Sequence, residues 1–185
     1  TEESLRRGLD LLGESFCMGL QFVCSDLWRP YLKVLAEQAG QAIHVLDRFH
    51  LMKQLGEAID DVRAGEVKRL KQDGYEPLLR HSRWCLLKRE ENLTERQTVT
   101  LEELLQYNLR TVRAYLLRED FQQFWEYRSP AWAGKFLDQW CGRVMRSRLE
   151  PLKKVARSLR RHRPLLLNWF RAKGTISAGI VEGFN

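Results

Sequence analysis

Two short apolar runs near the start of the chain predict a pair of parallel strands. The runs cover residues 21–24 and 42–46, both are rich in β-branched or aromatic residues, and helical spacing over residues 30–38 separates them. Continuous apolar runs of this length fit strands buried on both faces, with the helix as the crossover of a β–α–β unit. The carboxyl ends of such strands lie at one edge of the sheet, where ligands usually bind.

The rest of the apolar pattern is helical. An N-terminal stripe consists of Leu5, Leu9, Leu12 and Phe16, and a second helical face runs from residue 48 to about residue 71. Thr94 and Gln97 have the spacing of a capping box, and one long helix is predicted over residues 101–125. Prolines at positions 130, 151 and 164 open three further helices, and the tryptophans other than Trp28 have the helical spacing of core residues.

This pattern predicts an α/β fold that is predominantly helical, in three parts. Residues 1–48 form a partial α/β core with two parallel strands, and residues 49–174 form an all-α block. Residues 175–185 begin another helix, which the chain leaves incomplete. The chain therefore reads as part of a longer protein.

Composition and charge indicate a globular chain and a class of binding partner. The 185 residues are 44% hydrophobic and 30% charged, as expected of a globular chain, and neither a membrane-span-length apolar run nor a signal-peptide pattern is present. Four scattered cysteines without a CxxC pair indicate small apolar residues in a reducing cytosol. The formal net charge of +7 favours a polyanionic partner.

Positive charge is concentrated near the C-terminal end of the helical block. Between residues 143 and 163 the basic residues far outnumber the acidic ones, of which Glu150 is the only example. Five of them share one predicted helix face: Lys153, Lys154, Arg157, Arg160 and Arg161. A contact with the phosphate backbone of DNA and a solvated face that binds nothing are about equally supported by this pattern.

Each predicted strand is followed by an aspartate. Asp26 and Asp47 should therefore lie side by side at the sheet edge, as candidate cation ligands. Each also has a structural alternative, because Asp26 could cap the helix that begins near Pro30, and Asp47 could cap the helix that begins at residue 48. Trp28, beside Asp26, could stack on a base or sugar.

Three segments resemble a known family. SDLWRPY (residues 25–31), HVLDRFHLMK (44–53) and GIVEGFN (179–185) resemble insertion-sequence transposases of the ISL3 group, which are DDE enzymes with a ribonuclease-H-like catalytic core. The resemblance implies that Asp26 is the second catalytic acid and Glu182 the third, and that both bind the metal ions. Asp47 and His50 match a DxxH signature that lies near the active site in related transposases, and Trp28, Arg29 and Arg48 would contact DNA.

The resemblance also implies a function and its requirements. The intact protein would cleave and rejoin transposon-end and target DNA with two Mg²⁺ ions, for which Mn²⁺ could substitute. It would act as a dimer or larger assembly, away from membranes, in the bacterial cytoplasm at the nucleoid. The first catalytic aspartate would lie upstream of Thr1, so this chain alone is expected not to nick DNA. The alternative is a basic helical module, or a decayed transposase remnant, that binds nucleic acid without cutting it.

Overall fold

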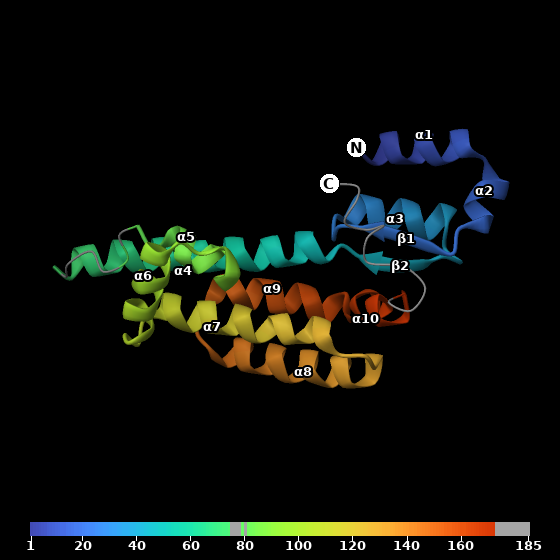
Figure 1. Cartoon of the computed structure of the whole chain (residues 1–185). Helices are drawn as coiled ribbons and strands as arrows, with labels where there is room; N and C mark the ends of the chain where they lie inside the picture. Colours follow the sequence, from blue (N-terminus) through green and yellow to red (C-terminus); the bar gives the residue numbers. More distant parts are fainter. Residues whose placement is uncertain (75–78, 80, 173–185) are drawn as a thin grey trace. The chain divides into compact units, whose positions relative to one another are not determined.

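The computed structural model describes residues 1–74, 79 and 81–172, and its elements are mostly helices (Figure 1). In chain order they are α1 (Glu2–Leu12), α2 (Glu14–Gly19), β1 (Phe22–Ser25), α3 (Arg29–Gln38), β2 (Ile43–Leu46), α4 (Arg48–Gln72), α5 (Arg83–Leu87), η1 (Glu90–Asn92), α6 (Glu95–Leu105), α7 (Arg110–Gln122), η2 (Gln123–Glu126), α8 (Pro130–Arg146), α9 (Glu150–Arg161) and α10 (Arg163–Ala172). They form two compact units.

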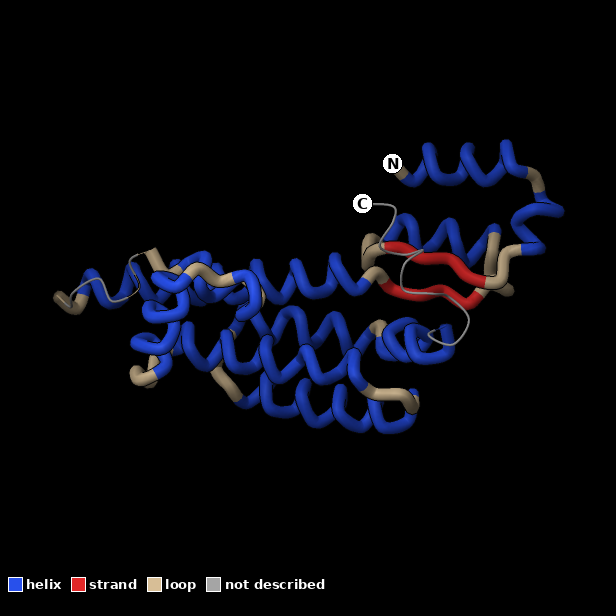
Figure 2. Tube along the Cα trace, in the orientation of Figure 1, coloured by secondary structure: helices blue, strands red, loops and turns tan. Residues whose placement is uncertain are grey.

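The first unit contains the predicted strand pair (Figure 2). β1 and β2 are parallel, and their register runs from Phe22 opposite Ile43 to Ser25 opposite Leu46. α3 connects the two strands and contacts β1. The β–α–β prediction is therefore confirmed, and each strand lies within one residue of its predicted position.

α10 closes the outer edge of β2. The amide nitrogens of Ile43 and Asp47 donate to carbonyl groups of the segment that contains β1, so the carbonyl group of His44 points to the opposite edge. Asn168 Nδ2 donates to that carbonyl oxygen at 2.8 Å, and α10 packs along the strand. A helix at this position satisfies an edge that would otherwise be open to pairing. The end of the helical block thus returns to the sheet.

A glycine lets α10 approach the first turns of α8 closely. A Cβ atom at Gly134 would lie 2.5 Å from Arg163 Nη2 and 3.3 Å from Leu167 Cδ1, so a larger residue would displace the end of the Arg163 side chain and crowd Leu167. Both helix segments belong to the first unit. The absent side chain therefore leaves room for Arg163 and Leu167 of α10 beside α8.

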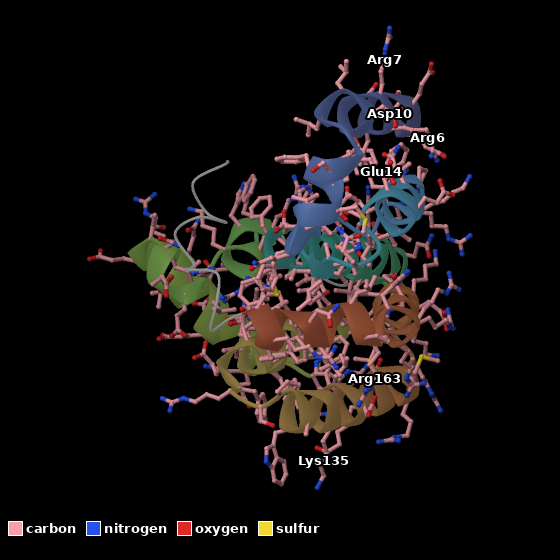
Figure 3. The ribbon with its side chains drawn as sticks, turned by 90° about the vertical axis from the view of Figure 1, so that its right-hand side faces the viewer. Arg6, Arg7, Asp10, Glu14, Lys135 and Arg163 are labelled. Carbon is pink, nitrogen blue, oxygen red and sulfur yellow. The ribbon has the colours of Figure 1, made fainter. Side chains whose placement is uncertain are left out.

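α1 and α2 pack on α3, but the predicted N-terminal stripe is only partly correct. Leu9 is buried with Cys17, Val34 and Leu35, whereas Leu12 and Phe16 are exposed. The reason is Gly13, whose φ of 86° ends α1 and starts α2 in a new direction. Polar contacts join α1 to α3, from Arg6 to Glu37 at 2.7 Å and from Gln38 to Asp10 at 2.6 Å; Figure 3 labels Arg6 and Asp10 on α1.

The second unit is organised around aromatic side chains. Phe121 stacks on Phe124 with centroids 5.3 Å apart and meets Trp140 edge-on at 4.7 Å. Trp140 Nε1 donates to the carbonyl oxygen of Leu117 at 2.7 Å. Trp125 and Trp140 are buried as predicted, but the core prediction is wrong for Trp84 and Trp132, which are exposed.

The long helix predicted over residues 101–125 is in fact two helices, α6 and α7. The predicted capping box of Thr94 and Gln97 is present and starts α6. A turn then follows, and α7 begins where Glu66 of α4 accepts hydrogen bonds from the backbone nitrogens of Arg110 and Thr111, at 2.9 and 2.7 Å. The Glu66 carboxylate thus caps the N-terminus of α7, for which the residues just before α7 provide no side-chain cap.

The observed architecture confirms the predominantly helical α/β class. Cys17, Cys85 and Cys141 are buried as small apolar residues, whereas Cys24 is exposed. No helix within the described ranges is long and apolar enough to cross a membrane.

Candidate active site at the strand ends

Asp26 and Asp47 follow the last paired residues of the two strands. Ser25 lies opposite Leu46, and the Asp47 backbone nitrogen donates to the Ser25 carbonyl oxygen at 2.9 Å. The two aspartates therefore occupy neighbouring positions at the carboxyl edge of the sheet, as the strand pattern predicted. Both residues are partly exposed.

Asp26 shapes the turn that leads into α3. Its Oδ1 accepts a hydrogen bond from the backbone nitrogen of Trp28 at 3.0 Å, and Trp28 is the residue that precedes the helix. Asp26 therefore orders the approach to α3 rather than capping its first turn. The carboxylate has a second oxygen, Oδ2, through which it could also hold a cation.

Asp47, in contrast, is the cap of α4. Its Oδ1 accepts from the backbone nitrogen of Phe49 at 2.8 Å, and its carbonyl oxygen accepts from Leu51. Its Oδ2 lies 2.6 Å from His50 Nδ1. Because a carboxylate can only accept, Nδ1 carries the proton, and Nε2 of the half-exposed ring is left to accept a proton or to bind an anion when protonated.

A polar chain behind Asp26 was not predicted from the sequence. Ser25 Oγ donates to the Asp26 carbonyl oxygen at 2.9 Å and lies 2.7 Å from His44 Nε2. Since the serine proton is used, His44 Nε2 is the donor in that second bond. Burial lowers the pKa of His44, which favours the neutral ring that this bond uses. The strand register, Val23 opposite His44 and Ser25 opposite Leu46, is the signal that places these side chains on one face.

Three of the residues predicted to contact DNA, namely Trp28, Arg29 and Arg48, adjoin these aspartates in the sequence. Trp28 is 44% exposed and Arg29 is exposed beside it, while Arg48 is partly exposed at the start of α4. Phe49 is 61% exposed, and it was not predicted from the sequence as a DNA contact. The segments Asp26-Leu27-Trp28 and Asp47-Arg48-Phe49 share one spacing, which could have pointed to it.

The basic helix is α9, in the second unit. Its inner face is buried through Leu152, Val155, Ala156 and Leu159. Glu150 engages two of the predicted DNA contacts, Lys153 at 3.0 Å and Arg157 at 3.5 Å. Burial raises the pKa of Cys141 to about 11, and Arg160 opposes that shift through its charge and a hydrogen bond, so Arg160 lies close to this thiol of α8. Lys154 and Arg161 are exposed.

Glu182 lies outside the described residues. Within the described ranges, no group of three or more histidine, cysteine, aspartate or glutamate residues is arranged to hold a metal ion. The described part of the site thus consists of the Asp26 carboxylate, the Asp47–His50 pair, and the aromatic and basic side chains next to them.

Comparison with known proteins defines the class. A model of the DDE transposases of the ISL3 type, described as "Transposase", matches residues 1–185, so the chain belongs to this transposase family. The transposase for insertion sequence element IS1001 of Bordetella parapertussis is 30% identical over 187 residues, which cover 100% of this chain and 46% of the relative. The transposase for insertion sequence element IS1557 of Mycobacterium tuberculosis is 27% identical over 198 residues, covering 95% of this chain and 44% of the relative.

The chain therefore spans less than half the length of these relatives. No solved structure matches it significantly.

Proposed function

We propose that this chain is part of the catalytic core of an insertion-sequence transposase, and that Asp26 is one of its metal-binding acids. The core would be ribonuclease-H-like, and the intact protein would cleave and rejoin transposon-end and target DNA, as a dimer or larger assembly at the nucleoid. The observation that carries the proposal is the position of Asp26: a carboxylate at the carboxyl end of a parallel strand, in a chain that matches the transposase family throughout.

The return of α10 to the sheet supports a role for Glu182. A nuclease of this type needs acids from distant parts of the sequence at one place. The hydrogen bond from Asn168 to the His44 carbonyl group joins the end of the helical block to β2, across 124 positions of sequence. α10 therefore lies against the same sheet as Asp26. We propose that Glu182 completes the site from there.

The described residues suit a hard divalent cation. Mg²⁺ prefers carboxylate oxygens and keeps several of its waters, so a site with few protein ligands is adequate. Asp26 Oδ2 would hold the cation together with Glu182, whereas both oxygens of Asp47 already accept hydrogen bonds. Bound Mg²⁺ or Mn²⁺ would supply charge stabilisation for displacement at a phosphodiester.

The Asp47–His50 pair would act on the DNA and not on the metal. Asp47 fixes the tautomer and the orientation of the half-exposed imidazole ring, and Nε2 has no part in this pair. In its protonated form this nitrogen can donate to a phosphate oxygen. Trp28, Arg29 and Arg48 would add backbone and base contacts, and α9 would contact other phosphates.

Cleavage of transposon-end DNA by the full-length protein that carries this chain tests the proposal. Asp26→Asn and Glu182→Gln should each lower cleavage in Mg²⁺ by about 100-fold or more, because a metal ligand contributes several kcal/mol to the transition state. Binding to the same DNA should change little. Asp61→Asn, on an exposed position of α4, is the matched control. Full cleavage by Asp26→Asn would leave the non-catalytic binding module as the better account.

A further inference from the structure

The two strand ends share one local design. Asp26 Oδ1 accepts from the backbone nitrogen of Trp28, and Asp47 Oδ1 accepts from that of Phe49, at 3.0 and 2.8 Å. In both cases the aspartate directly follows a strand and fixes the backbone of an aromatic residue two positions later. Because the strands are neighbours in register, the same aspartate–aromatic turn occurs twice at one edge of the sheet.

Both aromatic side chains are exposed although their backbones are fixed. Trp28 is 44% exposed and Phe49 is 61% exposed, so neither ring contributes its full area to the core. Each meets one ring nearly at right angles: Tyr31 lies 4.6 Å from Trp28, and His50 lies 5.7 Å from Phe49. Such contacts restrict the rotamers of the two rings. An exposed aromatic ring with restricted rotamers is a preorganised surface for binding.

Each ring adjoins one cationic residue in the sequence, in addition to the aspartate of the same turn. Arg29 follows Trp28 in the sequence, and Arg48 precedes Phe49. Aromatic side chains that alternate with cationic ones are typical of surfaces that bind single-stranded nucleic acid: the rings stack on bases, and the cations follow the phosphates. A protein partner with an acidic surface would use the arginines but would have no comparable use for both ring faces.

We propose that Trp28 and Phe49 form a pair of stacking surfaces that take unpaired bases of DNA at the strand ends. An unpaired base exposes its π-face, whereas a base inside a duplex is covered by its neighbours. The strand ends therefore bind DNA with unpaired nucleotides in preference to an uninterrupted duplex. This inference rests on the proposed function, since it takes the same sheet edge as the DNA site, and it adds the state of the DNA that the edge selects.

The test measures binding of the 185-residue chain to two DNAs without divalent metal. One is a duplex, and the other is the same duplex with three unpaired nucleotides that include 2-aminopurine, whose fluorescence falls on stacking. Phe49→Ala and Trp28→Ala should each weaken binding to the interrupted DNA by about 5- to 150-fold and should restore the fluorescence. Binding to the uninterrupted duplex should change by less than about 2-fold.

Conservative variants separate stacking from a general loss of structure. Phe49→Tyr keeps an aromatic face and should bind like the parent, whereas Phe49→Leu keeps apolar bulk without that face and should bind like Phe49→Ala. Trp84→Ala is the matched control, because Trp84 is 54% exposed and belongs to the second unit. It should leave the preference for unpaired nucleotides unchanged.

Three outcomes would overturn the inference. They are equal binding of the two DNAs by the parent, retained quenching in Phe49→Ala, and a change in self-association of Phe49→Ala without a change in DNA binding. The last would show that another protein surface covers the ring. Because the assay contains no metal, its failure leaves the cleavage result for Asp26→Asn intact. A failure of that cleavage result would likewise leave a measured base preference standing.

Discussion

Individual carboxylates at the strand ends differ in what they can do, although the sequence makes them look equivalent. Asp26 and Asp47 both follow an apolar strand, which the sequence was sufficient to predict. Their difference comes from the next three residues. His50 lies in the first turn of α4, and its Nδ1 donates to the second oxygen of Asp47 at 2.6 Å. Asp47 therefore orients the His50 ring in addition to capping α4. Only the structure distinguishes these roles, because the side-chain rotamers decide which groups donate to each carboxylate oxygen.

The ionised side chain of Glu119 on α7 lowers the stability of the folded protein at neutral pH. Burial raises its pKa above the ordinary value of 4.5, and the charge of Arg118 opposes this shift. Its Oε1 is buried and accepts no hydrogen bond from the described residues, although Arg118 Nε lies 3.5 Å away. Arg118 instead donates to the carbonyl oxygens of Leu86 and Lys88, at 2.7 and 3.5 Å. The charged form of Glu119 is therefore less favourable in the folded protein than in the unfolded chain.

Glu119→Gln should raise the free energy of unfolding at pH 7. The raised pKa means that the contribution of Glu119 to stability is fully present below about pH 4.5 and is lost as pH rises through the folded-state pKa. The gain from the variant should therefore disappear as the pH falls to 4. Urea unfolding at pH 7 and pH 4 measures both values. Glu102→Gln, on an exposed position of α6, should show no such pH dependence. An equal gain in the free energy of unfolding at pH 4 and pH 7 would show that burial of the charged Glu119 is not the cause.

At the scale of the element, the start of α7 depends on a residue from another helix. Glu66 is 3% exposed and accepts from the backbone nitrogens of Arg110 and Thr111 and from Thr111 Oγ1, the last at 2.7 Å. Arg69 pairs with it from the next turn of α4, at 3.2 Å. Apolar periodicity alone predicts one helix over α6 and α7. The break between the two helices is not visible in the local pattern, because it depends on this tertiary contact.

Glu66→Ala should destabilise the chain by about 2–4 kcal/mol, because it leaves buried donors at the start of α7 without an acceptor. Glu66→Gln keeps one carbonyl acceptor and should cost less. Glu57→Gln, on an exposed position of the same helix, should stay within about 0.5 kcal/mol of the parent. Urea unfolding provides the values. Equal stability of the parent and Glu66→Ala would show that solvent satisfies this helix start.

The basic face of α9 was predicted from sequence as one group of five residues, and the structure divides it. Glu150 pairs with Lys153 and Arg157, and Arg160 lies near Cys141. Helical spacing defines a shared face, but it does not show which cations have an intramolecular partner. Lys154 and Arg161 are therefore the better candidates for phosphate contacts.

The double variant Lys154→Gln, Arg161→Gln should reduce the slope of log K against log salt concentration by about 2, since each lost phosphate contact removes about 0.9. Lys153→Gln is the internal control and should change the slope by less than about 0.5. Fluorescence titrations with duplex DNA between 50 and 200 mM salt, roughly the range in which counterion release dominates, give these slopes. An unchanged slope in the double variant would identify the face as merely solvated.

For the whole molecule, the central feature is that the helical block begins and ends on the same strand. α4 leaves from the end of β2, and α10 returns to its outer edge (Figure 1). The sequence could predict the two strands and the presence of a long helical segment, because both are local patterns. It could not predict that Asn168 meets His44, because nothing local to either residue encodes a contact across the block.

In the proposed function, this return would allow Asp26 and Glu182 to share a cation. The most direct measurement is hydroxyl-radical cleavage of the polypeptide by Fe²⁺ bound in place of Mg²⁺, in the full-length protein that carries this chain. The account predicts two cuts, one near residue 26 and one near residue 182, both lost in Asp26→Asn and both lost in Glu182→Gln. A cut near residue 182 that persists in Asp26→Asn would show that the two carboxylates do not hold the same metal ion.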